Sequence, residues 1–300
     1  MKILMITNPG AGFNKGLKAG EKTALLLKGS GIEVDHKISR FPGHTIEIIK
    51  NHYGDRYDAV VGVGGDGTLY EIINGIFKVT DNPDIPIGII PVGTGNSFSR
   101  DINVHSIEDG VEAILSADKI KVDVGIYRWF GKQYYFINVL GVGFVADVCK
   151  KAYNFRNLGA LSYIMGVFII TAGLKSFDLQ LTIDGEVYKR KNCFIEFCNS
   201  RYTAGNMLMA PHARLDDGYL DIILLNDISK FGLIRSFPSV FTGKHVKNPH
   251  VEVFKGKQIN VITSEPKVLT PDGEVFGTTP IEVDIRPQAV YIFKKGNLEL

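Results

Sequence analysis

Three glycine-rich turns carry residue types that bind phosphate. The first turn is Asn8-Pro9-Gly10-Ala11-Gly12, the second is Gly62-Val63-Gly64-Gly65-Asp66-Gly67-Thr68, and the third is Pro91-Val92-Gly93-Thr94-Gly95-Asn96. Glycine lets backbone N–H groups approach phosphate oxygens, and the N-terminus of a following helix adds favourable partial charge. Each turn alone is as consistent with an ordinary strand-to-helix connection as with a phosphate site. Three in one chain predict a nucleotide site.

Several carboxylates stand in such turns. Asp66 can either cap a helix that starts at Thr68 or orient magnesium or an acceptor hydroxyl, and we favour the second role because its loop should line phosphate. Asp217-Gly218 is, on sequence alone, a hairpin turn. Asp272-Gly273-Glu274 is also a turn by default. Its two carboxylates around one glycine can nevertheless supply a proton acceptor for phosphoryl transfer and a partner for that acceptor.

Both common nucleotide fingerprints fail. The second turn matches GxGxxG, but the next predicted strand, 85–90, holds no carboxylate where a dinucleotide site needs one. A P-loop is also absent, because each Gly-Lys pair lacks the following serine or threonine.

The three turns follow predicted strands that alternate with helices. Such alternation predicts an open, mostly parallel α/β sheet with right-handed crossovers, whose ligands lie beyond the carboxyl ends of the strands. The three turns should therefore converge on one edge of one sheet. The predicted strands are 3–7, 31–38, 59–63 and 85–90, and the predicted helices are 17–29, 45–52, 68–77 and 107–116.

After about Val124 the pattern changes to short strands separated by Asp-Gly turns, which predicts a β-rich, sandwich-like domain. We place the domains at 1–124 and 125–300, and the last strand, about 290–300, is a candidate to return to the first domain. Helical segments are expected at 153–174 and 231–241. The predicted strands are 134–139, 179–184, 193–198, 220–225, 258–263, 281–285 and 290–293.

Composition excludes several classes of protein. With 34 Lys and Arg against 32 Asp and Glu, the chain lacks the basic field of a non-specific nucleic-acid binder. Three cysteines and seven scattered histidines show no disulfide framework and no zinc spacing. The N-terminus has no signal-peptide pattern, so we expect a cytoplasmic protein. The uncharged run 157–174 just reaches the length of a membrane span, but its polar residues and helical spacing favour a buried or surface-docking helix.

The motifs together resemble those of the diacylglycerol kinase, sphingosine kinase and ceramide kinase superfamily. Gly64-Gly65-Asp66-Gly67-Thr68, with Glu71 and Asn74, resembles its nucleotide loop, and the first and third turns resemble its other two phosphate loops. Leu215-Asp216-Asp217-Gly218 and Asp272-Gly273-Glu274 resemble two further signatures of bacterial members. The GGDG loop alone also resembles NAD kinases and phosphofructokinases. All five motifs, in family order, are specific.

The resemblance implies a role for each motif. Asp66, Asp272 and Glu274 are the candidate catalytic residues, and the choice of general base between the last two stays open. Magnesium would be bound by the Asp217 carboxylate and the carbonyls of Arg214 and Tyr219, an all-oxygen ligand set that suits this ion. The implied ATP contacts are Asn8, Pro9, Gly10, Ala11, Gly12, Ser39, Gly64, Gly65, Asp66, Gly67, Thr68, Leu69, Tyr70, Glu71, Gly93, Thr94 and Asn96.

The chain departs from the family pattern at two places. Ser97 stands where the family commonly has an aspartate, and Ala204-Gly205-Asn206 replaces its usual glycine triplet. The first departure removes an acid from the third loop. The second changes the acceptor side of the expected site.

The resemblance implies an ATP- and magnesium-dependent lipid kinase, with diacylglycerol as the leading acceptor and phosphatidate as the product. Two alternatives stay open: an enzyme like NAD kinase, and a nucleotide-binding regulator without catalysis. We expect a lipid substrate reached by peripheral association with the inner membrane face, where helix 157–174 would wall the acyl-chain pocket or dock on the bilayer. No nucleic-acid partner is expected, and the sequence leaves a homodimer open.

Overall fold

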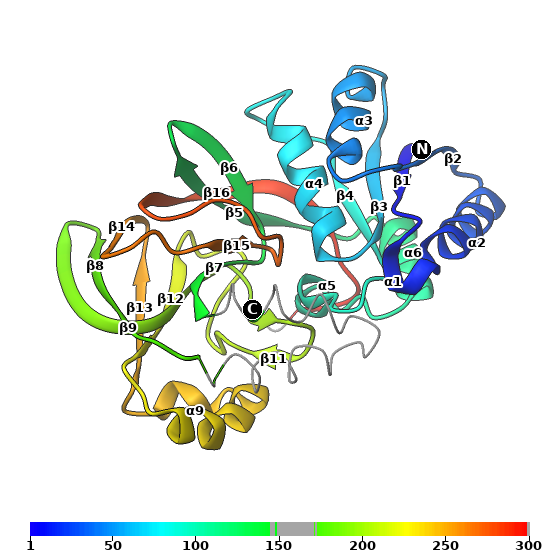
Figure 1. Cartoon of the computed structure of the whole chain (residues 1–300). Helices are drawn as coiled ribbons and strands as arrows, with labels where there is room; N and C mark the ends of the chain where they lie inside the picture. The colour runs from blue at the N-terminus through cyan, green and yellow to red at the C-terminus, as the bar shows by residue number, and fades with distance from the viewer. Residues whose placement is uncertain (145–147, 149–170, 172, 299–300) are drawn as a thin grey trace. The chain divides into compact units, whose positions relative to one another are not determined.

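The computed structural model describes residues 1–144, 148, 171 and 173–298 (Figure 1). The chain divides into two compact units, of which unit 1 holds Met1–Asp123 and Gln288–Leu300 and unit 2 holds Val124–Pro287. Strands β5 (Lys119–Trp129) and β16 (Ile281–Phe293) each begin in one unit and end in the other. The predicted helix 153–174 lies almost entirely outside the described residues.

Unit 1 is built on parallel strands in the order β4-β3-β1-β2. The end of β16 extends this sheet, because Ile292 pairs in parallel with Ile87 of β4. Every residue of β3 is buried, as expected of a strand covered on both faces. The strands are β1 (Lys2–Thr7), β2 (Glu33–Ile38), β3 (Ala59–Gly64) and β4 (Ile87–Pro91).

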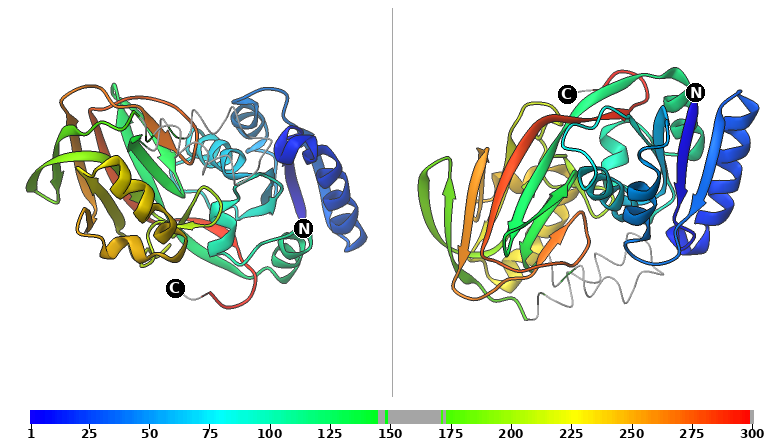
Figure 2. Two further views of the ribbon diagram at one scale, coloured as in Figure 1. Left: turned by 60° about the horizontal axis from the view of Figure 1, so that its bottom comes forward. Right: turned by 90° about the horizontal axis from the view of Figure 1, so that it is seen from above.

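Helices cover both faces of this sheet. Right-handed crossovers in this strand order put α2 on one face and α3 and α4 on the other. The packing agrees, since α2 contacts α6 whereas α3 contacts α4 (Figure 2). The helices are α1 (Ala11–Asn14), α2 (Gly16–Gly29), α3 (His44–His52), α4 (Asp66–Phe77), α5 (Ser97–Asp101) and α6 (Ile107–Ser116).

Unit 2 is an antiparallel β structure with strand order β13-β12-β9-β8-β14-β16; β7 pairs with β9 and β15, and β5 pairs with β6. Its helical segments are α9 (Lys230–Ser236) and the 3₁₀ turns η2 (Phe237–Thr242) and η3 (Lys244–Lys247). The strands are β6 (Lys132–Phe136), β7 (Val139–Gly143), β8 (Phe177–Ile183), β9 (Glu186–Cys198), β10 (Tyr202–Thr203), β11 (Met207–Leu208), β12 (Leu220–Asn226), β13 (Val251–Gly256), β14 (Gln258–Thr263) and β15 (Leu269–Pro271).

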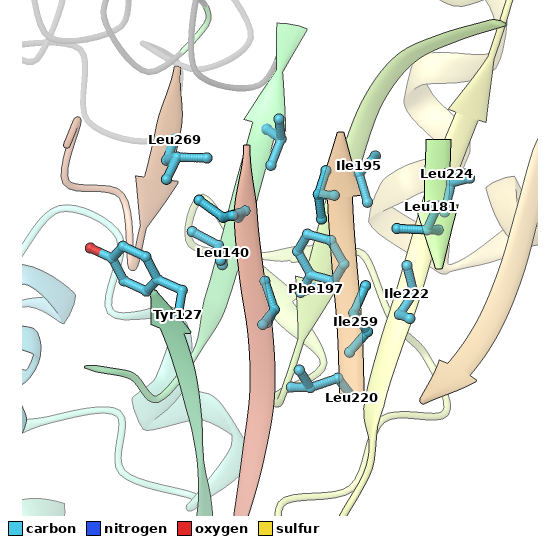
Figure 3. Close-up of a cluster of buried hydrophobic side chains, with 14 of the residues drawn as sticks. Tyr127, Leu140, Leu181, Ile195, Phe197, Leu220, Ile222, Leu224, Ile259 and Leu269 are labelled. Carbon is cyan, nitrogen blue, oxygen red and sulfur yellow. The ribbon is translucent and has the colours of Figure 1, made fainter. Parts of the chain in front are cut away.

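The core of unit 2 consists of two apolar clusters that meet along β9. Side chains alternate between the faces of a strand, so Ile195 and Phe197 join one cluster while Phe194 and Cys198 join the other. Figure 3 shows Ile195 and Phe197 among Leu140, Leu181, Ile222 and Ile259 of the neighbouring strands. The C-terminal half of β9 is therefore buried on both sides.

The predicted fold class, a parallel α/β sheet followed by a β-rich region, is confirmed. Two predicted strands, 281–285 and 290–293, are in fact the single strand β16, because Pro287 interrupts the sequence pattern without ending the strand. The predicted segment 231–241 is split between α9 and η2. The edge strand β13 was not predicted, and its exposed positions are Val253 and Lys255.

One carboxyl group is buried within the apolar part of β9. Glu196 shares a face with Phe194 and Cys198, and only 4% of its surface is exposed. Burial raises the pKa of the Glu196 carboxyl to about 8, because the ionised form would lose its hydration. At neutral pH the folded protein therefore holds Glu196 mainly in its protonated form.

This burial predicts that the folded state loses stability as pH rises from about 4.5 to about 8. In that window the unfolded chain has released the Glu196 proton, whereas the folded chain retains it, so higher pH favours unfolding. Asp221, whose pKa is also raised by burial, acts in the same direction. The free energy of unfolding of Glu196→Gln minus that of the wild type should therefore increase by about 2–5 kcal/mol from pH 5 to pH 8.

Urea unfolding at several pH values measures this difference, and the Asp221 contribution cancels in the comparison. Glu186→Gln, at the exposed start of the same strand, is the matched control and should keep the wild-type pH dependence. A Glu196→Gln curve parallel to the wild-type curve would show that Glu196 is ionised in the folded state.

Candidate functional site

The three glycine-rich turns lie at the carboxyl ends of the adjacent strands β1, β3 and β4. The chain passes from β1 to β2 on one side and from β3 to β4 on the other, so the strand order reverses between β1 and β3. Ligands of open α/β sheets bind at such a reversal. The Asn8 N–H donates to the Val63 carbonyl over 3.0 Å, which fixes the first turn to the end of β3.

These turns touch through their backbones. The Val92 and Gly93 N–H groups both donate to the Gly64 carbonyl, at 2.8 and 3.1 Å. A Cβ atom on Gly93 would lie 2.5 Å from the Gly65 Cα, and one on Gly12 would lie 2.1 Å from the Val92 carbonyl oxygen. Only glycine permits these approaches. The predicted convergence of the turns is therefore present within unit 1.

Two buried side-chain oxygens at this surface have no hydrogen-bond partner among the described residues. They are Thr68 Oγ1, at the start of α4, and Asn96 Oδ1. The Nδ2 atom of the same Asn96 amide donates to the Gly93 carbonyl at 2.7 Å. Buried polar atoms are rarely left unpaired. The Thr68 hydroxyl can donate to a phosphate oxygen, and Asn96 Oδ1 can accept from a hydroxyl or contact a cation. Together with the glycine backbone, these atoms fit a nucleotide phosphate chain.

Asp66 holds the third turn in place. Its carboxylate oxygens accept the N–H groups of Ser97 at 2.9 Å and Phe98 at 3.2 Å, at the start of α5. The alternative that Asp66 caps a helix starting at Thr68 is wrong, because α4 already begins at Asp66 and the side chain bonds the first N–H groups of α5 instead. The favoured role of Asp66 beside magnesium or an acceptor hydroxyl stays a prediction. Burial raises the pKa of the Asp66 carboxyl, while these N–H groups and the Arg100 charge oppose that rise.

Ser97, which stands where the family commonly has an aspartate, is buried beside Asp66 in unit 1. Only 1% of Ser97 is exposed, and its N–H group bonds Asp66. An aspartate at position 97 would place a second buried carboxylate beside Asp66, where the two negative charges would repel unless a cation joined them. Serine leaves Asp66 as the single carboxylate at this contact.

Two other residues predicted to contact the nucleotide, Glu71 and Ser39, form hydrogen bonds within unit 1. Glu71 accepts the N–H groups of Gly43 at 2.7 Å and Thr45 at 3.2 Å, which ties α4 to the start of α3. The buried Ser39 donates its N–H group to the Thr7 carbonyl at 2.9 Å. Their contact with a nucleotide stays a prediction. The other predicted contacts, Pro9, Gly10, Ala11, Gly67, Leu69, Tyr70 and Thr94, lie in the same turns or at the start of α4.

In unit 2, Asp272 follows β15 and organises the neighbouring chain. Its carboxylate accepts three backbone N–H groups, from Ile137 at 3.0 Å, Asn138 at 2.9 Å and Val139 at 3.0 Å. Only 5% of Asp272 is exposed, whereas Glu274 is exposed. A carboxylate offers about four lone-pair positions, and three on Asp272 are taken. Glu274 is therefore the better placed of the two to accept a proton from a substrate.

The predicted magnesium ligand Asp217 already has a cation beside it. Its carboxylate accepts the Tyr219 N–H at 3.0 Å and contacts the Lys255 ammonium at 2.8 Å, and Lys255 also pairs with the buried Asp221 at 3.3 Å. Arg214 directs its side chain to Asp216 at 3.4 Å. With Lys255 in this position the residues do not fit a further cation, so magnesium could bind Asp217 only by displacing the ammonium.

Unit 2 also contains an apolar cavity of about 90 Å³, which the sequence analysis did not find. Its walls include Phe194, Met207, Leu225, Leu233 and Phe237. Ala204, where the family has glycine, also lines it and keeps a glycine-like φ of +46°. The one signal in the sequence was a lone acid, Glu196, within an apolar strand.

No helix within the described residues is long and apolar enough to cross a bilayer. In that same part of the chain, no three His, Cys, Asp or Glu side chains form a group suited to holding a metal. Most of the run 157–174 lies outside the residues that the structure describes.

Known proteins share this arrangement along the whole chain. A family model for the diacylglycerol kinase catalytic domain matches residues 2–127, and one for the YegS C-terminal NAD kinase β-sandwich-like domain matches residues 138–294. A diacylglycerol kinase of Mycobacterium tuberculosis is 28% identical over 98% of this chain and 95% of its own length.

Solved structures agree with these matches. A candidate diacylglycerol kinase from Bacillus anthracis superposes with a TM-score of 0.82 at 25% identity, covering 98% of this chain and 97% of its own. An NAD kinase from Archaeoglobus fulgidus in complex with ATP shares the fold at a TM-score of 0.56 and 16% identity, with 98% and 94% covered. The predicted resemblance is confirmed: this chain belongs to the diacylglycerol kinase-like family of bacterial lipid kinases.

Proposed function

We propose that this protein transfers the γ-phosphate of ATP, in the presence of magnesium, to the hydroxyl of diacylglycerol and so forms phosphatidate. The observation that carries the proposal is the meeting of the three glycine turns at the strand reversal of unit 1. Gly93 packs on Gly65 there, and Thr68 Oγ1 and Asn96 Oδ1 have no partner among the described residues. This combination of exposed backbone and available polar atoms suits a triphosphate.

The cavity of unit 2 supports a lipid acceptor. Its walls are mainly aliphatic and aromatic, and the two titratable side chains among its described lining residues, Glu196 and His245, are both kept neutral by burial. An acyl chain gains free energy on entering such a cavity, whereas a charged dinucleotide would lose hydration without finding counter-charges. This contrast favours diacylglycerol over NAD.

Each set of residues has a distinct part in the proposed transfer. In unit 1 the turns hold the phosphates and Asp66 keeps the third turn in position. In unit 2, Glu274 takes the proton of the lipid hydroxyl, whose oxygen bonds the γ-phosphorus as the bond to the ADP oxygen breaks. Magnesium, when bound with ATP, would supply neutralisation of the phosphate charge. Asp272 is a positioning residue, because its carboxylate is committed to three N–H groups.

A substrate panel tests the activity directly. The purified chain is incubated with labelled ATP, magnesium and, separately, diacylglycerol, sphingosine, phosphatidylglycerol or NAD. We expect labelled phosphatidate from diacylglycerol and no product without magnesium. Labelled NADP would instead establish the NAD kinase alternative. ATP binding with no product from any acceptor would establish a nucleotide-binding regulator.

Variants of the Asp-Gly-Glu turn separate its two carboxylates. Glu274→Gln should lower kcat by about 10²- to 10⁴-fold in a protein that still folds, since its amide cannot accept a proton. Asp272→Asn should instead cost about 1–3 kcal/mol in the free energy of unfolding, because its amide N–H₂ would face backbone N–H donors. Turnover and urea unfolding measure the two effects.

Glu265→Gln, an exposed acid on the approach to β15, is the matched control and should alter neither quantity. If Glu274→Gln keeps full turnover and a folded Asp272→Asn loses it, the two roles are reversed. If both variants turn over normally, the turn is only a hairpin and Asp66 becomes the leading candidate for the base.

The ammonium at Asp217 gives a test of the magnesium site. Lys255→Met should leave Asp217 and Asp221 without their counter-charge, so its Tm should fall without magnesium and recover by about 2 °C or more on adding it. The wild type should respond less, because magnesium must first displace Lys255. Asp217→Asn should abolish the response.

Lys257→Met is the matched control, since this lysine lies over the Tyr219 ring and forms no ion pair with Asp217 in the described structure. Thermal unfolding with magnesium or with a chelator measures all four proteins. Identical magnesium responses in all of them would exclude a magnesium site at Asp217.

A further inference from the structure

The cavity of unit 2 contains a carboxyl group that the proposed transfer does not use. Glu196 lines the cavity and is 96% buried, since 4% of its surface is exposed. Its Oε2 atom has no hydrogen-bond partner within the described part of the chain. An unpaired buried carboxyl costs stability, so its presence in a mainly apolar wall indicates that a ligand bonds it.

The surroundings of Glu196 define the chemistry of that partner. Phe194 and Leu225 lie on the cavity wall beside it, and His245, the other titratable side chain there, donates Nε2–H to the Met209 carbonyl at 2.9 Å. Burial lowers the pKa of His245, so the imidazole is neutral. Among the described residues that line the cavity, Glu196 is the one carboxylic acid, and the polar Thr203, Ser236 and Asn248 stand among mainly apolar side chains. The cavity suits an uncharged, mainly apolar ligand that contains a hydrogen-bond acceptor for Glu196.

The size of the cavity limits how much of a ligand it takes. The volume of about 90 Å³ is several times the roughly 10–15 Å³ at which a void first holds one water molecule. That space accommodates part of a lipid. An ester group with its adjoining carbons fits this description, because its carbonyl oxygen accepts one hydrogen bond and its neighbours are apolar.

The strand register connects Glu196 to the Asp272–Glu274 turn. Gly141 of β7 lies opposite Glu196 of β9 on one side and opposite Thr270 of β15 on the other. Two strand spacings put the Glu196 and Thr270 backbones about 10 Å apart, and β15 leads directly into the turn that carries Glu274. In a 1,2-diglyceride an ester is attached to the carbon next to the one that bears the free hydroxyl. The Glu196 and Glu274 carboxyl groups can therefore both contact one glyceride molecule.

We propose that Glu196 is a specificity-determining residue whose protonated carboxyl donates a hydrogen bond to an ester carbonyl of the acceptor lipid. This inference rests on the proposed function, because it assumes that the lipid hydroxyl is the phosphate acceptor. An ether lipid lacks the carbonyl and binds less well. An amino lipid is disfavoured, since its ammonium would require an ionised Glu196 in an apolar cavity.

The test compares 1,2-dioctanoylglycerol with its diether analogue, 1,2-dioctylglycerol, on the full chain. For each lipid, kcat and KM are measured in mixed micelles, and binding without ATP is measured by calorimetry. The wild type should prefer the ester by about 3- to 10-fold, mainly through KM and binding. Glu196→Leu should lose this preference, whereas Glu196→Gln, which still has an N–H donor, should keep most of it.

Leu225→Met is the matched control, because it changes an apolar wall residue without touching the carboxyl group and should leave the preference intact. Equal use of ester and ether by the wild type, or an unchanged preference in Glu196→Leu, would overturn this inference and leave the proposed kinase activity standing. If neither lipid binds or is phosphorylated, the proposed function fails and the role of Glu196 fails with it.

Discussion

The close approach of three backbone turns is the constraint on which the nucleotide half of this protein depends. Gly93 meets Gly65 and Gly12 meets Val92 at distances that leave no room for a Cβ atom. These contacts exist because β1, β3 and β4 are adjacent and parallel, so that the turns after them emerge at one edge. Helices on both faces keep those strands buried and in register. The sheet therefore serves to bring three short backbone segments together.

Much of this arrangement could be predicted from the sequence, for a physical reason. Strand order and the edge at which turns emerge follow from alternating strands and helices and from the fixed hand of their crossovers. Glycine at 12, 65 and 93 then marks the points of close contact. The partners of the carboxylates could not be predicted in this way. That Asp66 caps α5 and Glu71 caps α3 depends on tertiary contacts between residues about 30 positions apart.

The β-rich unit shows the same limit more strongly. Its Asp-Gly turns were visible, and Asp184-Gly185 does join β8 to β9 with positive φ at both residues. Sequence spacing could not show that Lys255 reaches Asp217 from the neighbouring strand β13, or that Asp272 receives three N–H groups from residues about 130 positions earlier. The cavity was not predicted for a further reason. It is lined by side chains from many separate elements, and the lone acid Glu196 within an apolar strand was its one local sign.

The carboxylates of the candidate sites differ chiefly in how their charge is compensated. Asp272 has three backbone N–H groups, Asp66 has two, Asp217 has an ammonium, and the exposed Glu274 has access to water. Glu196 has none of these within the described residues, and burial therefore leaves it protonated. Carboxylates with such partners serve structure, because they hold the groups around them in place. An exposed one can exchange a proton with a substrate, whereas a buried, uncompensated one becomes a hydrogen-bond donor. Carboxyl side chains thus have three different roles in this protein, and the surroundings of each side chain determine its role.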